Sequence, residues 1–185
     1  MNTELMPAMM EIDGCIGLSC LAERETGRCI ATSAWRSMET MRASANQVTG
    51  LRERLISTMR AKDPLIQEWE IPLMHRYHAA PEGACARLSW LQGSPANLDN
   101  AIESFRMITP ELDDLTGFCS ASLLVNQDTG LACATVVYED ADAVARTRQM
   151  GTSLRTQVAE QANAKVIEVA EFELAMAHLH VPELV

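Results

Sequence analysis

The chain has 185 residues, of which 48% are hydrophobic and 22% are charged, a composition typical of a soluble globular protein with one or two domains. Its formal net charge is −10, and residues 80–185 carry six Lys and Arg against fifteen Asp and Glu. Such an acidic surface repels phosphate backbones, so we expect no nucleic-acid partner. Because the sequence has no membrane-length apolar run and no recognisable signal peptide, we expect no membrane contact and a cytoplasmic location.

The cysteines and the short motifs exclude several kinds of chemistry. The six cysteines stand at positions 15, 20, 29, 85, 119 and 133, and no two of them have the C-x-x-C spacing. Most lie in apolar runs, which favours small core residues in a reducing compartment. The sequence has no glycine-rich phosphate loop and no G-x-S-x-G motif, so we expect no cofactor and no bound metal.

The first half of the chain reads as a hairpin, a helix and a strand. Residues 15–22 and 28–35 are short strand-like runs joined by a polar turn with glycine, which predicts a β-hairpin. Ser37 is a good N-cap for the helix that follows. Period-two alternation in residues 66–77 then predicts a closing strand.

The second half repeats this order and adds an earlier portion. Residues 84–91 alternate like a strand, and residues 97–115 read as a helix. A hairpin at 118–138, a helix after Asp140 and a strand at 166–179 follow. The predicted order is β-α-β-β-α-β, which is the ferredoxin-like plan.

The two halves are related by a shift of 103 residues that needs no gap. Gly14 corresponds to Gly117 and His75 to His178 at this shift, and most turn glycines and apolar positions are kept. We therefore predict a duplication, with one unit at 1–79 and a second at 80–185. The first unit lacks its opening strand, so we expect either that the native chain starts upstream of Met1, which we favour, or that another segment fills the place.

The stretch from Gly14 to Met41 resembles the core of the antibiotic biosynthesis monooxygenase family. The features that carry the resemblance are a Gly-x-x-Gly, a hairpin, and an aromatic residue followed by S-x-E-x-M at the start of a helix. In this chain they are Gly14, Gly17, Trp35, Ser37, Glu39 and Met41. The second copy departs from the pattern mildly, with Tyr138 in place of Trp35 and Asp140 in place of Ser37.

The resemblance implies a fold in which two such units pair sheet against sheet as a dimeric α/β barrel. We therefore expect an α+β protein with two tandem ferredoxin-like (βαββαβ) units forming a pseudo-dimeric barrel within one chain. The family includes cofactor-independent oxygenases of aromatic substrates. One hypothesis is thus a monooxygenase acting on an aromatic or quinone-like small molecule. The alternative is a non-enzymatic small-molecule-binding or stress-related protein that retains only the fold; a homodimer is compatible with either.

Six residues are the candidates for a site. His75 and His178 occupy equivalent strand positions and are candidate proton-transfer groups, although repeated solvated strand ends would look the same. His178 and His180 have a spacing compatible with a metal, but no further ligand accompanies them. The matched aromatic residues would line an apolar ligand cavity if they face the interior, or they are core packing. They are Trp35, Tyr138, Trp69 and Phe172.

Overall fold

The computed structural model describes residues 5–179 and 182–184, and its helices and antiparallel strands confirm the α+β class. The chain separates into two compact units, and each draws on distant parts of the sequence. Among the described residues, unit 1 comprises 5–21, 29–67 and 175–179, and unit 2 comprises 22–28, 68–174 and 182–184. The long strand β7 (Lys165–Leu179) begins in unit 2 and ends in unit 1.

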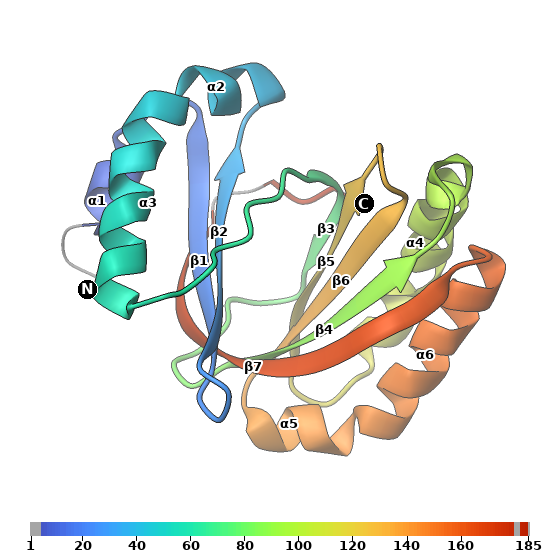
Figure 1. Cartoon of the computed structure of the whole chain (residues 1–185). Helices are drawn as coiled ribbons and strands as arrows, with labels where there is room; N and C mark the ends of the chain where they lie inside the picture. The colour runs from blue at the N-terminus through green and yellow to red at the C-terminus, as the bar shows by residue number, and fades with distance from the viewer. Residues whose placement is uncertain (1–4, 180–181, 185) are drawn as a thin grey trace. The chain divides into compact units, whose positions relative to one another are not determined.

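Unit 2 is built on a sheet with the strand order β7-β4-β6-β5-β3 (Figure 1). Its other elements are β3 (Glu70–Arg76), β4 (Cys85–Gln92), the 3₁₀ turn η1 (Pro95–Asn97), α4 (Leu98–Asp113), β5 (Phe118–Asn126), β6 (Leu131–Tyr138), α5 (Ala141–Arg146) and α6 (Arg148–Gln161). The strand pairs β3–β5, β5–β6, β4–β6 and β4–β7 are all antiparallel. Helices α4 and α6 cover one face of this sheet (Figure 1).

The core of unit 2 lies between those helices and the sheet. Apolar residues of α4 recur with helical spacing, and Phe105, Ile108 and Leu112 are each 3% exposed. They pack with Leu154 and Val158 of α6 and with the apolar face of the strands. Each helix buries its apolar stripe against the apolar face of the sheet, and both elements thereby remove apolar surface from water.

Unit 1 is smaller and holds the N-terminal elements with the end of β7. They are α1 (Leu5–Met10), most of β1 (Cys15–Glu23) and β2 (Arg28–Trp35), α2 (Met38–Ala43) and α3 (Ala45–Met59). Its strand order is β2-β1-β7. The small core combines Met9, Ile12, Leu18 and Leu51 with the half-buried Trp35.

The shift of 103 residues that relates the two predicted copies in sequence also relates their elements. Strand β1 corresponds in both bounds to β5, β2 to β6, and α2 to α5. Gly14 and Gly117 have φ angles of +82° and +80° before β1 and β5. The compact units divide the chain differently from the copies, because β3 belongs to the first copy in sequence but pairs with β5 in unit 2. The division at residues 79 and 80 stays a prediction.

Two local predictions from the sequence, one on a helix and one on a strand, were wrong in detail. The helix after Ser37 is divided at Ser44 into α2 and α3, and the Ser44 hydroxyl donates to the carbonyl of Met41. The closing strand of the first copy begins at Glu70 rather than at residue 66, so Trp69 precedes it. Of the six cysteines, Cys29 is exposed while the other five are buried.

We predict that Gly117→Ala lowers the free energy of unfolding by about 3 kcal/mol, and that Gly83→Ala lowers it by about 1 kcal/mol. Both glycines have φ near +80°, so alanine brings a backbone cost of roughly 1–2 kcal/mol at either site. Only at Gly117 would the new Cβ also lie 2.6 Å from the Cβ of Ala143, whereas nothing lies within 4 Å at Gly83. Urea denaturation checks this, and equal losses would contradict the tight approach of α5 to the turn before β5.

Candidate functional site

Unit 2 holds a solvent-open groove of about 760 Å³. Its walls come from the centre of β4, the N-terminal half of α6, the first part of β7 and the turn between β1 and β2. The residues that line it are Glu23, Thr26, Arg28, Arg87, Arg148, Thr152, Arg155, Glu168, Val169, Ala170 and Glu171. Four arginines and three glutamates thus surround one depression.

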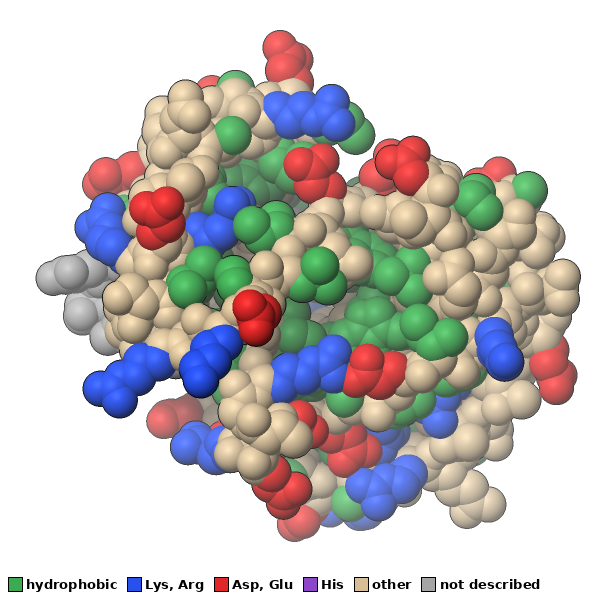
Figure 2. All heavy atoms as spheres, viewed as in Figure 1, with side chains coloured by type: hydrophobic (Ala, Val, Ile, Leu, Met, Phe, Trp, Pro, Cys, Tyr) green, Lys and Arg blue, Asp and Glu red, His purple; other side chains and the backbone are tan. Residues whose placement is uncertain are grey.

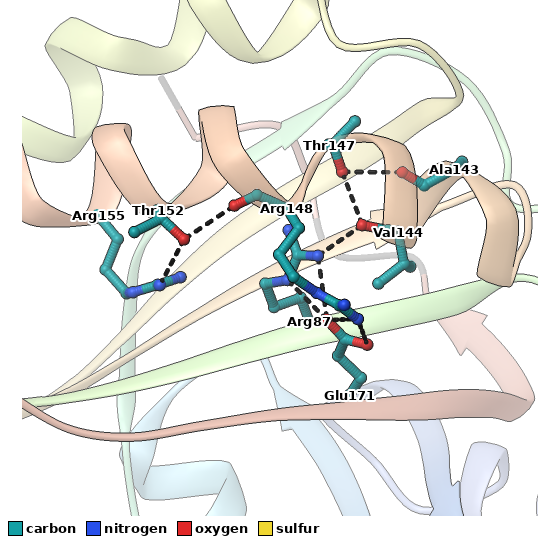
Figure 3. Close-up of polar contacts among 8 residues, drawn as sticks. All are labelled: Arg87, Ala143, Val144, Thr147, Arg148, Thr152, Arg155 and Glu171. Carbon is teal, nitrogen blue, oxygen red and sulfur yellow. Dashed lines mark hydrogen bonds and ion pairs between the residues drawn. The ribbon is translucent and has the colours of Figure 1, made fainter.

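Arg87 is the buried member of this set. It lies on β4 directly opposite Glu171 of β7, and its side chain is only 5% exposed. Its Nε and Nη2 donate to Oε1 of Glu171 at 3.1 and 3.0 Å (Figure 3). Nη2 also donates to the carbonyl of Val144 at 2.5 Å. The guanidinium therefore joins the sheet to the C-terminal end of α5, where helix carbonyls favour a cation.

Glu171 is shared between two arginines. Arg148 of α6 donates from Nη2 to Oε2 of Glu171 at 3.0 Å (Figure 3). Partial burial alone would raise the pKa of Glu171, but the hydrogen bonds from Arg148 and Arg87 outweigh it, so the pKa is lowered. The carboxylate is therefore ionised at neutral pH and neutralises one of the two positive charges that contact it.

Arg155 adds a third positive charge at the same place. It is half-buried on α6, and its Nη2 donates to the hydroxyl of Thr152 at 3.1 Å. Within the described part of the chain, no carboxylate lies within ion-pair distance of Arg155. Burial and the positive charge of Arg87 lower the pKa of Arg155, but a guanidinium stays charged at neutral pH. Three guanidinium groups thus line one groove, and two of them, those of Arg87 and Arg148, share the carboxylate of Glu171.

One nitrogen of Arg87 has no hydrogen-bond acceptor. Nη1 is fully buried and makes no hydrogen bond. It lies against Gly151 of α6, where an added Cβ would be 2.8 Å from it. A buried donor of a charged group that lacks an acceptor is costly, so this nitrogen marks a place where an acceptor would be bound favourably.

A second, smaller hollow of about 40 Å³ lies between the sheet and helices α4 and α6 of unit 2. Its walls are mainly apolar, and Arg87 and Arg155 line both it and the groove. The residues that line it are Arg87, Ser89, Leu91, Phe105, Ile108, Leu112, Ala134, Val136, Tyr138, Gly151, Leu154, Arg155 and Val158. This volume admits a water molecule or a diatomic gas, but not an aromatic ring.

The four predicted aromatic residues are distributed between the units. Tyr138 is 1% exposed and lines the small cavity, with its ring centre 5.8 Å from the Arg87 guanidinium carbon. Phe172 is buried beneath the guanidinium of Arg28 in unit 2. Trp35 packs on the core of unit 1, and Trp69 is half-buried before β3. Their roles in ligand binding stay predictions.

The two predicted histidines lie in different units, His75 on β3 in unit 2 and His178 near the end of β7 in unit 1. Neither lines the groove or the small cavity. His75 places Nε2 2.7 Å from Asp113 and Nδ1 3.0 Å from Glu183, so both of its nitrogens are occupied. His180 lies outside the described residues. Among the described residues, no cluster of three His, Cys, Asp or Glu side chains is close enough to hold a metal.

The sequence reasoning missed the arginines. Positions 85, 87, 89 and 91 share the core-facing side of β4, and Arg87 is the charged residue among them. That charge at a core-facing position was the available signal. No such signal marked Arg148 and Arg155 in the sequence, because charged residues are normal on the exposed side of a helix. Figure 2 shows basic and acidic side chains lying beside one another over one face, so surface charge would not single out the site either.

The chain is similar to proteins of Mycobacterium tuberculosis (strain ATCC 25618 / H37Rv). It is 47% identical over 185 residues to the uncharacterised protein Rv2558, and the alignment covers 98% of this chain and 77% of Rv2558. It is 44% identical over 182 residues to the uncharacterised protein Rv2557, and the alignment covers 98% of this chain and 81% of Rv2557. No family model matches the chain. Among the described residues, no helix is long and apolar enough to cross a membrane.

Solved structures share the fold. A candidate monooxygenase from Fusobacterium nucleatum has a TM-score of 0.67 at 15% identity, covering 95% of this chain and 82% of its own. An anthrone oxidase-like protein has a TM-score of 0.65 at 12% identity, and the superposition covers 98% of this chain and 87% of that protein's chain. A third structure is a Listeria monocytogenes ferredoxin-fold protein related to antibiotic biosynthesis monooxygenases. Its TM-score is 0.52 at 4% identity, and the superposition covers 90% of this chain and 98% of that protein's chain. These likenesses confirm the predicted family resemblance at the level of the fold.

We predict that Gly151→Ala lowers the free energy of unfolding by about 1 kcal/mol, while Gly50→Ala raises it by up to about 1 kcal/mol. Both are helical glycines, and alanine gains roughly 1 kcal/mol in helix propensity at either position. Nothing lies within 4 Å of the Cβ site at Gly50, but at Gly151 the guanidinium of Arg87 must move, at roughly 1–3 kcal/mol. Thermal and urea denaturation measure both variants, and a stabilised Gly151→Ala would contradict the tight packing of Arg87.

We also predict that His75→Gln costs more stability at pH 5.5 than at pH 8.5. Burial lowers the pKa of His75, but the hydrogen bonds and charges of Asp113 and Glu183 outweigh it and raise the pKa. The stabilisation is therefore fully present below the unfolded-state pKa of about 6.5, and is lost as the pH rises through the folded-state pKa. Urea denaturation at both pH values checks this, and Asp113→Asn should reproduce the trend. An equal loss at the two pH values would contradict it.

Proposed function

Because this chain belongs to the family of the two uncharacterised Mycobacterium tuberculosis proteins, and has the fold of antibiotic biosynthesis monooxygenases, we propose that it oxidises a small aromatic or quinone-like molecule with O₂, without a metal or flavin. The observation that carries this proposal is the meeting of a groove and an apolar cavity at Arg87 and Arg155, which line both. The groove, at about 760 Å³, has the size of ordinary ligand sites.

The two hollows suit the two reactants. A ring system fits only in the groove, whereas the cavity of about 40 Å³ has apolar walls and room for O₂. Where they meet, guanidinium groups stabilise negative charge that develops on a substrate oxygen. The groove carboxylates Glu168 and Glu171 are the proposed proton acceptors.

The proposed reaction needs no external reductant. A CH₂ group flanked by aromatic rings loses a proton, and its carbanion is delocalised as an enolate or phenolate. This anion transfers electrons to O₂ and bonds to one oxygen atom. That atom remains as a carbonyl oxygen and the other leaves as water, so the four-electron oxidation of the carbon balances the reduction of O₂. The protein contributes charge stabilisation and positioning.

A second function is a small-molecule-binding or stress-related role without catalysis. The small volume of the cavity favours it, because about 40 Å³ is far below the roughly 300–1,000 Å³ of ordinary ligand sites. In that case a ligand would occupy the groove alone, and the fold would be retained without the chemistry.

The architecture we propose with this function is a tandem duplication that forms a pseudo-dimeric barrel within one chain. It is supported by the recurrence of element bounds at a spacing of 103 residues and by the exchange of closing strands, since β3 of the first copy pairs with β5 of the second. A cytoplasmic location and a homodimer of the chain are part of the same proposal.

The proposal predicts oxygen uptake with anthrone or 1,8-dihydroxyanthrone, which both carry a CH₂ group between aromatic rings, measured with an oxygen electrode and with ¹⁸O₂ labelling of the product. With anthrone, one labelled atom should enter the carbonyl for each O₂ consumed. Ala134→Leu should fill the cavity and lower kcat/KM at least tenfold, while Ala145→Leu on the exposed side of α5 should leave it unchanged. Absence of uptake with both substrates would contradict the oxidation and favour the binding function.

A further inference from the structure

We propose that the ligand of unit 2 is an organic anion, with an aromatic or alicyclic ring, whose ionised oxygen binds between Arg87 and Arg155. The inference rests on the proposed function in that it names the ligand class of the same site. It concerns binding alone and would hold with or without oxidation.

The local balance of charge is the first reason. Arg87, Arg148 and Arg155 line the α6 side of the groove, and Glu171 pairs with Arg87 and Arg148 but not with Arg155. Of the other acidic groups nearby, Glu168 pairs with Arg28 and Glu173 with Arg24, while Glu23 accepts from the hydroxyl of Thr26. The cluster therefore carries an excess positive charge, which a bound anion would neutralise.

The burial of Arg87 is the second reason. If the excess positive charge were exposed, water would solvate it. The side chain of Arg87 is only 5% exposed, however, and its Nη1 has no hydrogen-bond acceptor. Because Nε and Nη2 are already held by Glu171 and Val144, the guanidinium is fixed in place. A fixed guanidinium with an unused donor favours an anionic oxygen over a neutral one, because hydrogen bonds between charged groups are about twice as strong.

The apolar surface beside the arginines argues for an organic anion rather than an inorganic one. Val169 and Ala170 line the groove, and the small cavity beyond Arg87 and Arg155 is walled mainly by aliphatic side chains and Phe105. Phosphate or sulfate would leave this surface in water. A ring that bears a carboxylate or phenolate oxygen would cover it and place its charge on the arginines at the same time.

The test is isothermal titration calorimetry under nitrogen with 1-naphthoate and its neutral counterpart, 1-naphthalenemethanol, and with inorganic phosphate as a ring-free anion. We expect 1-naphthoate to bind at least tenfold more tightly than either of the other two. Arg155→Met should weaken naphthoate binding at least tenfold and leave binding of the neutral alcohol unchanged. Arg106→Met, on the exposed side of α4, makes the same change in net charge and should have no effect.

Arg87→Met should weaken naphthoate binding more than Arg155→Met does, provided that circular dichroism shows a folded protein. If this variant does not fold, Arg155→Met decides alone, since within the described residues the side chain of Arg155 hydrogen-bonds only to the exposed Thr152 and its loss leaves the Arg87–Glu171 pair in place. Binding of the alcohol as tight as that of naphthoate, unchanged naphthoate binding in Arg155→Met, or phosphate binding as tight as that of naphthoate would each overturn the inference. So would a failure of naphthoate to bind the unmodified protein.

These outcomes are distinguishable from failure of the proposed oxidation. Naphthoate has no oxidisable CH₂ group, and the titration excludes O₂. Arginine-dependent binding of naphthoate without oxygen uptake on any substrate would support the inference and contradict the oxidation. Oxygen uptake that is unaffected by Arg155→Met would support the oxidation and overturn the inference.

Discussion

The ion pair between Arg87 of β4 and Glu171 of β7 is the interaction on which the site depends. It joins two neighbouring strands directly across their register and reaches the end of α5 through the carbonyl of Val144. A buried guanidinium is stable only when a counter-charge neutralises it and acceptors satisfy its N–H donors. Removal of one partner of a buried pair typically lowers the free energy of unfolding by roughly 3–5 kcal/mol. Because Glu171 also serves Arg148, the pair does not neutralise the cluster. The same interaction that stabilises the sheet leaves a charged place for a ligand.

The packing of α6 explains how the arginine can be buried there. Gly151 offers no side chain at the point where α6 passes over Nη1 of Arg87, so the helix approaches the guanidinium closely. On one side of this contact the apolar core of unit 2 leaves a small cavity, and on the other a polar groove opens to solvent. Folds of this kind host many activities, so it is this local arrangement, rather than the ferredoxin-like plan, that carries the functional argument.

Local patterns predicted much of the fold. The hairpins were recognisable because alternating strand residues flank a turn glycine, and β6 runs from Leu131 to Tyr138 as predicted. The pairing of β3 with β5 was not predictable, since alternation identifies a strand but not its neighbour. Tyr138 lines the small cavity, and its predicted role in ligand binding stays a prediction, whereas the arginines around it come from β4 and α6. Only tertiary packing brings them together, and no spacing within one element could reveal it.

The most direct test of this account is a crystal structure of the protein grown with 1-naphthoate. The account predicts that the carboxylate lies within hydrogen-bonding distance of both Arg87 and Arg155, with the naphthalene ring along the groove beside Val169. A ring bound elsewhere, or a carboxylate that leaves Nη1 of Arg87 without an acceptor, would contradict it.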